Sequence, residues 1–240
     1  MVKTTLCPFN CCVATLLLQI HSSLNGLAWI LQPTDRHRCY CKNSIHRKAD
    51  AAYRGRPPEL YTLPEDWFLF KVYARDTFQD ILHNWHICYH GTDVDKLESI
   101  LHIGLRIPGD RDMYGHIITE QTGHYNEYNK PYGFETERIF LSPSILYAGC
   151  DVYAHPHCYK SKITGSTYEV KVAVLVLIKP GSYDVSGSTI EEQSIDPIIA
   201  DAEIEWSTNQ RNRHVVTGFL VRFDRYECTG HPNGWTCWTF

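Results

Sequence analysis

Short runs of apolar residues become regular from Tyr61 onward and predict a series of β-strands. The runs at 66–74 and 85–90 are rich in aromatic and β-branched residues, which favour strands. The run at 167–183 is the longest and contains a Pro-Gly turn, so we expect it at the centre of a sheet. Three further strands are expected at 138–141, 202–206 and 214–223.

A helix is predicted directly after the strand at 85–90. Thr92 and Asp93 can accept hydrogen bonds from the free N–H groups of its first turn, and Gly104 suits its C-terminal cap. A shorter helix is expected within residues 144–154. The apolar residues of the first helix recur at helical spacing: Val94, Leu97, Ile100 and Leu101.

One dominant helix followed by strands that are joined mostly by loops predicts an α+β fold with a largely antiparallel sheet. The chain has no βαβ repetition, no G-x-G-x-x-G motif and no phosphate-binding P-loop. A dinucleotide-binding doubly wound fold and a nucleoside-triphosphatase are therefore excluded.

The first 58 residues differ in pattern from the rest of the chain. An apolar stretch at 11–31 is followed by a basic polar segment that ends in a Pro pair. We expect residues 1–58 to be an extension or linker and residues 59–240 to form one domain. Lys3 and the apolar residues after it loosely imitate a secretory signal, but no clear cleavage site follows. An intracellular protein, cytoplasmic or nuclear, is expected, with a secreted one as the alternative.

Composition narrows the class of protein further. The chain has 240 residues, 43% of them apolar, which is enough for a buried core. Its formal net charge of -4 gives no broad basic surface for duplex nucleic acid. No apolar stretch reaches the roughly 20 residues that span a bilayer. The ten cysteines are scattered, unlike a disulfide framework.

Three short motifs could carry chemistry: YHGT at 89–92, IFLSPSILYA at 139–148 and AEIEWST at 202–208. Each is weak alone, because a His-Gly pair can end a strand, Tyr147 can be a core residue and Glu205 can be a solvated carboxylate. Their order and spacing resemble the ADP-ribosyltransferase catalytic domain of the poly(ADP-ribose) polymerase type. The motifs are most similar to the form found in neuralized-like proteins, and the resemblance spans about residues 64–225.

This resemblance implies split antiparallel β-sheets with one main helix after the first motif, and NAD as co-substrate. His90 matches the histidine that binds the adenosine ribose, and Gly91 the glycine whose backbone holds the nicotinamide carboxamide. Ser144 matches the serine that shares this carboxamide, and Tyr147 the tyrosine that stacks on the nicotinamide ring. Glu205 matches the catalytic glutamate, and His90 is predicted to be catalytic as well. Thr92 completes the first motif as a cofactor-binding residue.

The second motif departs from the family pattern at Phe140, where a tyrosine is usual. Phenylalanine keeps the ring contact with NAD and loses a hydroxyl group, which puts the rate of catalysis in doubt. The chemistry still has its essential group, since cleavage of the nicotinamide–ribose bond develops positive charge on the sugar and Glu205 would stabilise it. Nicotinamide leaves as a neutral molecule, so no strong general acid is needed.

Several further residues extend this hypothesis. Glu203 lies two positions before Glu205 and would share its face if both lay in one strand. Residues 105–137 lack periodicity, and such long loops are usually functional. Residues 108–138 would occupy the position of the family's donor loop, where Arg111, His116 or His124 would meet the pyrophosphate.

Metal and hydrolase chemistry are not expected. His155, His157 and Cys158 are too close in sequence for the usual spacing of a structural zinc site. There is no G-x-S-x-G motif, and Cys88 lies within a predicted strand without a reactive context.

The sequence therefore predicts an NAD-dependent ADP-ribosyltransferase that transfers single units to an unidentified protein acceptor. Phe140 favours the alternative of a catalytically weak or inactive module for protein interaction, working with ubiquitin-ligase machinery. A third hypothesis is an RNA 2′-phosphotransferase, which would need a basic groove of several Arg and His residues that this sequence does not indicate.

Overall fold

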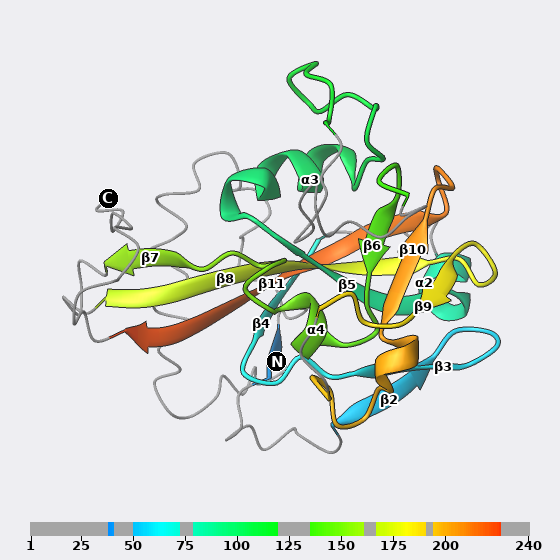
Figure 1. Ribbon diagram of the computed structural model, residues 1–240, viewed down its shortest axis with the longest axis horizontal. Helices are drawn as coiled ribbons and strands as arrows, with labels where there is room; N and C mark the ends of the chain where they lie inside the picture. The colour runs from blue at the N-terminus through cyan, green and yellow to red at the C-terminus, as the bar shows by residue number, and fades with distance from the viewer. Residues whose placement is uncertain are drawn as a thin grey trace, which may run out of the picture.

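The computed structural model describes residues 38–40, 50–72, 79–119, 135–160, 167–190 and 194–226. The main sheet has the strand order β1-β4-β11-β8-β5, with β7 paired to β8 beside this path, and all its pairings are antiparallel (Figure 1). Its strands are β1 (Arg38–Cys39), β4 (Phe68–Lys71), β5 (His86–Thr92), β7 (His157–Lys160), β8 (Thr167–Ile178) and β11 (His214–Tyr226).

A second sheet has the order β6-β10-β9 and lies beside β5. It consists of β6 (Ile139–Leu141), β10 (Glu205–Thr208) and β9 (Asp184–Ser186). Tyr89 of β5 and Ser142 exchange two backbone hydrogen bonds of 2.7 and 2.9 Å, which join the two sheets at one point. A separate hairpin pairs β2 (Ala51–Arg54) with β3 (Glu59–Thr62). The expected α+β class with antiparallel sheets is confirmed.

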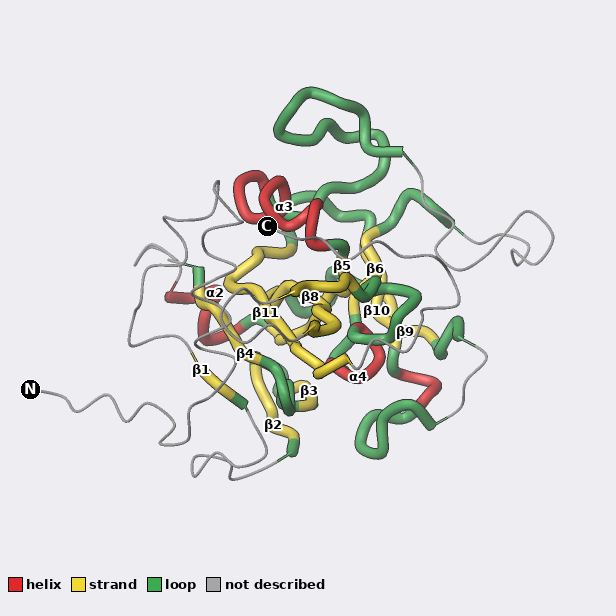
Figure 2. Tube along the Cα trace, turned by 90° about the vertical axis from the view of Figure 1, so that its left-hand side faces the viewer, coloured by secondary structure: helices red, strands yellow, loops and turns green. Residues whose placement is uncertain are grey.

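Helices α3 (Leu97–Ile103) and α4 (Ile145–Ala148) lie on opposite faces of β5 (Figures 1 and 2). Side chains alternate between the faces of a strand. Cys88 therefore packs in the same apolar cluster as Leu97 of α3, and Tyr89 in the same cluster as Ile145 of α4. The remaining helices are α2 (Gln79–Asn84) and the short 3₁₀ helices η3 (Val94–Lys96) and η4 (Asp201–Glu203).

Strand β8 is the centre of the core, as its apolar sequence predicts. Every second residue from Val170 to Ile178 is buried on the α3 face, while Ala173 and Leu177 are buried on the other face. A strand that is covered on both sides reads as a continuous apolar run rather than an alternating one. This is why the segment from 167 onward gave the clearest strand signal.

The predicted helix after β5 is present, with one difference at its start. Gly104 caps α3 with a φ of 78°, a left-handed conformation that favours glycine. The Asp93 side chain makes no capping hydrogen bond, and the prediction that it would do so is wrong. Its Oδ1 instead lies 2.7 Å from Nδ1 of His155, a contact across 62 residues that no local pattern reveals.

Two other sequence-based boundaries need correction. The expected division at residue 58 falls inside the β2–β3 hairpin, and Arg38–Cys39 pairs with β4, so parts of the supposed extension belong to the fold. These strands are too short to show a period. The expected strand at 202–206 begins only at Glu205, because Asp201–Glu203 forms a 3₁₀ helix. The signal-like segment at the N-terminus lies outside the described residues.

No helix among the described residues is long and apolar enough to cross a membrane.

Candidate functional site

Glu205 lies at the start of β10 and is only 3% exposed. Its Oε2 accepts hydrogen bonds from the Tyr147 hydroxyl at 2.8 Å and the Thr189 hydroxyl at 2.9 Å, and the Tyr153 hydroxyl lies 3.5 Å away. The two tyrosine hydroxyls are 2.8 Å apart. We call these four residues, which come from β10, α4, the turn after α4 and the segment after β9, the hydroxyl cluster.

The two phenols of the hydroxyl cluster act as hydrogen-bond donors at neutral pH. Burial raises the pKa of Tyr147, and the nearby Glu205 raises it further. The pKa of Tyr153 is also raised, chiefly by burial and then by Tyr147. Both side chains therefore keep their protons, which they can direct at the carboxylate.

Gly91 lies beside the hydroxyl cluster at the edge of β5. A Cβ atom at this position would be 2.1 Å from the Ala148 carbonyl oxygen and 2.8 Å from Cβ of Tyr153. The glycine is therefore needed for close packing of β5 against α4 and the turn that follows it. Protein atoms therefore fill the space that the missing Cβ leaves, so this space is not open to a ligand.

The backbone N–H and C=O of Gly91 point in a different direction from the one that a Cβ atom would take. In an antiparallel ladder, the N–H and C=O of alternate residues point to the same neighbour. Tyr89 directs both groups at Ser142, away from β8, so Gly91 directs its own pair to the same edge. In the part of the chain that the structure describes, no strand pairs with Gly91 there. A donor and an acceptor therefore lie side by side at this edge.

His90 lies on the α3 face of β5, opposite the hydroxyl cluster. Its Nδ1 is 2.8 Å from the carbonyl oxygen of Phe140, which can only accept, so Nδ1 donates. Burial lowers the pKa of His90, although the hydrogen bond to Phe140 acts in the opposite direction. In the neutral ring, Nε2 is then a hydrogen-bond acceptor.

A cavity of about 390 Å³ lies on the α3 face, between the end of α3 and the start of β11. Its apolar walls include Ile100 and Val216, and Arg106 and the Asp110–Arg211 ion pair also line it. His214 faces the cavity and contributes to the lowered pKa of His90. The cavity and His90 therefore lie on the same face of the sheet.

The other predicted ligand contacts are placed as follows. Ser144 is fully buried, and its hydroxyl caps α4 by accepting from the Tyr147 N–H at 3.1 Å. Thr92 is 7% exposed at the end of β5. Phe140 is half-buried in β6, opposite Ser207 of β10. Tyr147 and Glu205 thus meet directly, whereas His90 is separated from them by the β5 strand.

The further residues that the sequence suggested for the NAD site make no contact with the hydroxyl cluster where the structure describes them. Glu203 is exposed on η4, so its expected shared strand face with Glu205 is wrong. Arg111 bonds to the Gly115 carbonyl and His116 to Asp112, all within one exposed turn. His124 lies outside the described residues.

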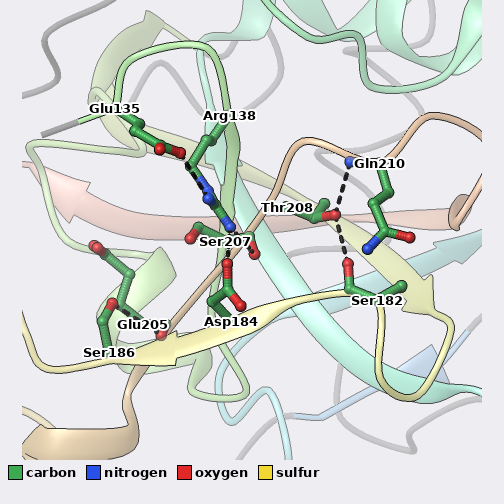
Figure 3. A network of polar contacts seen from close by, with 9 residues as sticks. All are labelled: Glu135, Arg138, Ser182, Asp184, Ser186, Glu205, Ser207, Thr208 and Gln210. Carbon is green, nitrogen blue, oxygen red and sulfur yellow. Dashed lines mark hydrogen bonds and ion pairs between the residues drawn. The ribbon is translucent and has the colours of Figure 1, made fainter.

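Arg138 holds together the small sheet that carries Glu205 (Figure 3). Its guanidinium donates to Glu135 at 2.8 Å, to Asp184 of β9, and to the Ser207 carbonyl of β10 at 3.2 Å. The Arg138 side chain is only 15% exposed, whereas the Glu135 and Asp184 carboxylates that it contacts are largely exposed. Ser186 of β9 donates to the Glu205 carbonyl at 3.4 Å. Both strands that flank β10 are thereby fixed.

Sequence reasoning missed Tyr153, Thr189 and Asp196. No motif marks them, because their hydrogen-bond partners in the site are 16 or more positions away in sequence. The signal that could have found Tyr153 is its spacing of six residues from Tyr147, since the two rings contact each other and Tyr153 lies beside Gly91.

Among the described residues, no group of three or more His, Cys, Asp or Glu side chains lies close enough together to hold a metal ion. His155 and His157 both approach Asp93, at 2.7 and 4.0 Å. Cys88 is fully buried in β5, and burial raises the pKa of its thiol well above the usual value.

No protein-family model matches the chain.

Proposed function

We propose that the protein is an NAD-dependent ADP-ribosyltransferase that transfers single units, built on the split-sheet fold of that enzyme class. The observation that carries this proposal is the contact of Tyr147 with the buried Glu205, 2.8 Å between Oη and Oε2, beside the strand edge at Gly91. A buried carboxylate held by hydroxyl donors is costly in the folded state, and such groups cluster at functional sites.

In this proposal, NAD binds across the free edge of β5. The N–H and C=O of Gly91 match the acceptor and donor of the nicotinamide carboxamide, and Tyr147 covers the nicotinamide ring. On the other side of the strand, Nε2 of His90 accepts from a ribose hydroxyl. The cavity beside His214 takes the adenine, which has an apolar face for Ile100 and Val216.

The reaction breaks the bond between the nicotinamide nitrogen and C1′ of the ribose. Nicotinamide leaves as a neutral molecule with the bonding electrons, and the developing positive charge on the sugar lies next to Glu205. The acceptor nucleophile then forms a bond to C1′ and loses a proton to a base or to water. Because Glu205 is nearly covered, Tyr153 and Thr189 must move aside before the ribose reaches it.

The test is release of nicotinamide from labelled NAD, together with transfer of label to protein. We expect Glu205→Gln to lower turnover by about 100-fold or more, since it removes the charge that stabilises the transition state. Glu203→Gln is the matched control, because it removes the same charge from an exposed position two residues away. Wild-type protein that binds NAD and releases no nicotinamide would disprove the enzymatic activity.

The second candidate is a non-catalytic ADP-ribosyltransferase-like module that acts in protein interaction. Two observations favour it: the Glu205 carboxylate already has donors within the protein, and Phe140 replaces the family tyrosine. Calorimetry with a non-hydrolysable NAD analogue, run beside the turnover assay, separates the two candidates. Binding without turnover favours the module, and binding with turnover favours the enzyme.

A further inference from the structure

Strand β9 is the outer strand of the small sheet that carries Glu205. β10 pairs with one side of it, and among the described residues no strand and no backbone hydrogen bond joins its other side. All three of its residues are exposed. In an antiparallel ladder, alternate residues direct their N–H and C=O groups away from the paired strand. The outer side of β9 therefore presents backbone donors and acceptors that a further strand can use.

The side chains of β9 divide between the two faces of the sheet. Val185 lies opposite the buried Trp206 of β10, yet is itself 51% exposed, so it extends the apolar face of Trp206 to the edge of the sheet. Asp184 and Ser186 lie on the other face, where Ser186 is opposite Glu205. The edge thus has an apolar side and a polar side.

The polar side of this edge carries a net negative charge. Asp184 and Glu135 both contact Arg138, and their carboxylates are 76% and 63% exposed (Figure 3). The Arg138 side chain between them is mostly covered. Two carboxylates thus face solvent beside one guanidinium group, so the charge that complements this edge is positive.

We propose that β9 docks an extended segment of a partner protein in which basic and β-branched residues alternate. The segment adds a strand to the small sheet, and its backbone bonds to the outer side of β9. Its basic side chains lie on the face of Asp184, and its apolar side chain lies opposite Val185. This inference goes beyond the proposed function, because the docking needs no NAD and applies equally to an enzyme and to an interaction module.

The charge of the edge disfavours the other occupants. Two β9 strands from two copies of the chain would bring the carboxylates of Asp184 and Glu135 from both copies together, and like charges across a strand pair are destabilising. Nucleic acid and anionic membrane surfaces are repelled by the same carboxylates. A basic segment of another protein has the complementary charge.

The first test is binding of a labelled synthetic peptide to the full chain, measured by fluorescence anisotropy. The probe is a peptide of alternating arginine and valine. Its controls are a peptide of the same composition with the arginines grouped together, and a peptide of alternating glutamate and valine. We expect the probe to bind about tenfold or more tightly than either control, and to bind less tightly as salt is added, since exposed charges are screened. Equal binding of the grouped peptide would contradict strand addition.

Variants of the β9 edge locate the peptide on the protein. Val185→Lys should lower the affinity for the probe by about tenfold or more, because it puts a positive charge on the apolar side of the edge. Ile117→Lys is the matched control, since Ile117 is also β-branched, is 59% exposed and lies in the turn after α3. Asp184→Asn should weaken binding by a smaller factor, and Asp95→Asn, at a 65% exposed carboxylate, is its control. Unchanged affinity in both β9 variants would overturn the proposal.

Methylation of the peptide backbone separates strand addition from simple attraction of charge. Methyl groups on every second amide nitrogen, placed in the two possible registers, block either the N–H groups that face β9 or those that face away. We expect one register to abolish binding and the other to leave it nearly unchanged, whereas equal effects would exclude a strand pairing.

Sedimentation of the full chain tests the competing occupant. A monomer is expected, and a dimer that Val185→Lys dissociates would assign the edge to a second copy and refute the proposal. Neither result depends on NAD: absence of nicotinamide release contradicts the proposed function alone, and absence of peptide binding contradicts the docking alone.

Discussion

The apolar cluster on the α3 face of strand β5 and the hydroxyl cluster beside its Gly91 differ in character. On the α3 face, Cys88 packs among aliphatic residues such as Leu97 and Val174, and the polar side chains of His86, His90 and Thr92 share this face. On the α4 face, a carboxylate and three hydroxyls, the hydroxyl cluster, lie within hydrogen-bonding distance of one another. The first face is explained by burial of apolar area. In the hydroxyl cluster, buried polar groups lose their hydration and gain little from packing, which indicates a functional role.

The comparison predicts that the α3 face contributes most to stability. Leu97 is 1% exposed, and Leu97→Ala should lower the free energy of unfolding by about 2–5 kcal/mol, from lost transfer energy and the cavity left behind. Urea unfolding followed by circular dichroism measures this change. Leu146→Ala, at a 40% exposed position of α4, is the control and should cost far less. Equal losses in the two variants would contradict the comparison.

Gly91 tests how closely the α4 face is packed. Gly91→Ala places a Cβ 2.1 Å from the Ala148 oxygen, so α4 must shift, at a cost of about 1–3 kcal/mol. Gly187→Ala is the matched control, because its nearest neighbour would be at an ordinary 3.5 Å. Thermal unfolding of both variants measures the difference. A neutral Gly91→Ala would mean that α4 lies further from β5 than the structure shows.

The hydroxyl cluster itself is expected to contribute less to stability. Tyr153→Phe removes one donor and should lower the free energy of unfolding by about 0.5–1.5 kcal/mol, because the ring remains and Glu205 keeps two other donors. Tyr53→Phe, at a 71% exposed position, should have almost no effect. Urea titrations compare the two. A gain in stability from Tyr153→Phe would show that the buried hydroxyls are retained at a net cost.

The smallest expected effect is a change in the pH dependence of stability. Burial lowers the pKa of His90, so the unfolded chain takes up a proton at a higher pH than the folded chain does. Its stabilising contribution is complete above the unfolded value of about 6.5 and is lost as the pH falls toward the folded value. His90→Gln should flatten this part of the pH profile.

His83→Gln is the control for the pH profile, because His83 is exposed on α2. Urea midpoints measured between about pH 5 and pH 8 for the wild type and both variants give the comparison. A wild-type profile that His90→Gln leaves unchanged would show that His90 does not contribute to this pH dependence.

The local pattern predicted the elements that bury much apolar surface. Strands β5, β8 and β11, helix α3 and its Gly104 cap all follow from periodicity, because burial on a face repeats at the period of the element. Elements of two to four residues, such as β1, β2 and β9, are too short to show a period. The division at residue 58 was misplaced for the same reason.

The residue types of the three motifs can be read from the chain alone, and their order predicted that Tyr147 and Glu205 belong to one NAD site. The folded structure was needed to show that His90 lies on the other face of β5 and that protein atoms fill the space beside Gly91. It also showed that Tyr153, Thr189 and Asp196 contact the predicted residues. These outcomes depend on contacts between residues 16 to 58 positions apart. Sheet pairing and helix placement set such contacts, and no local period of the chain encodes them.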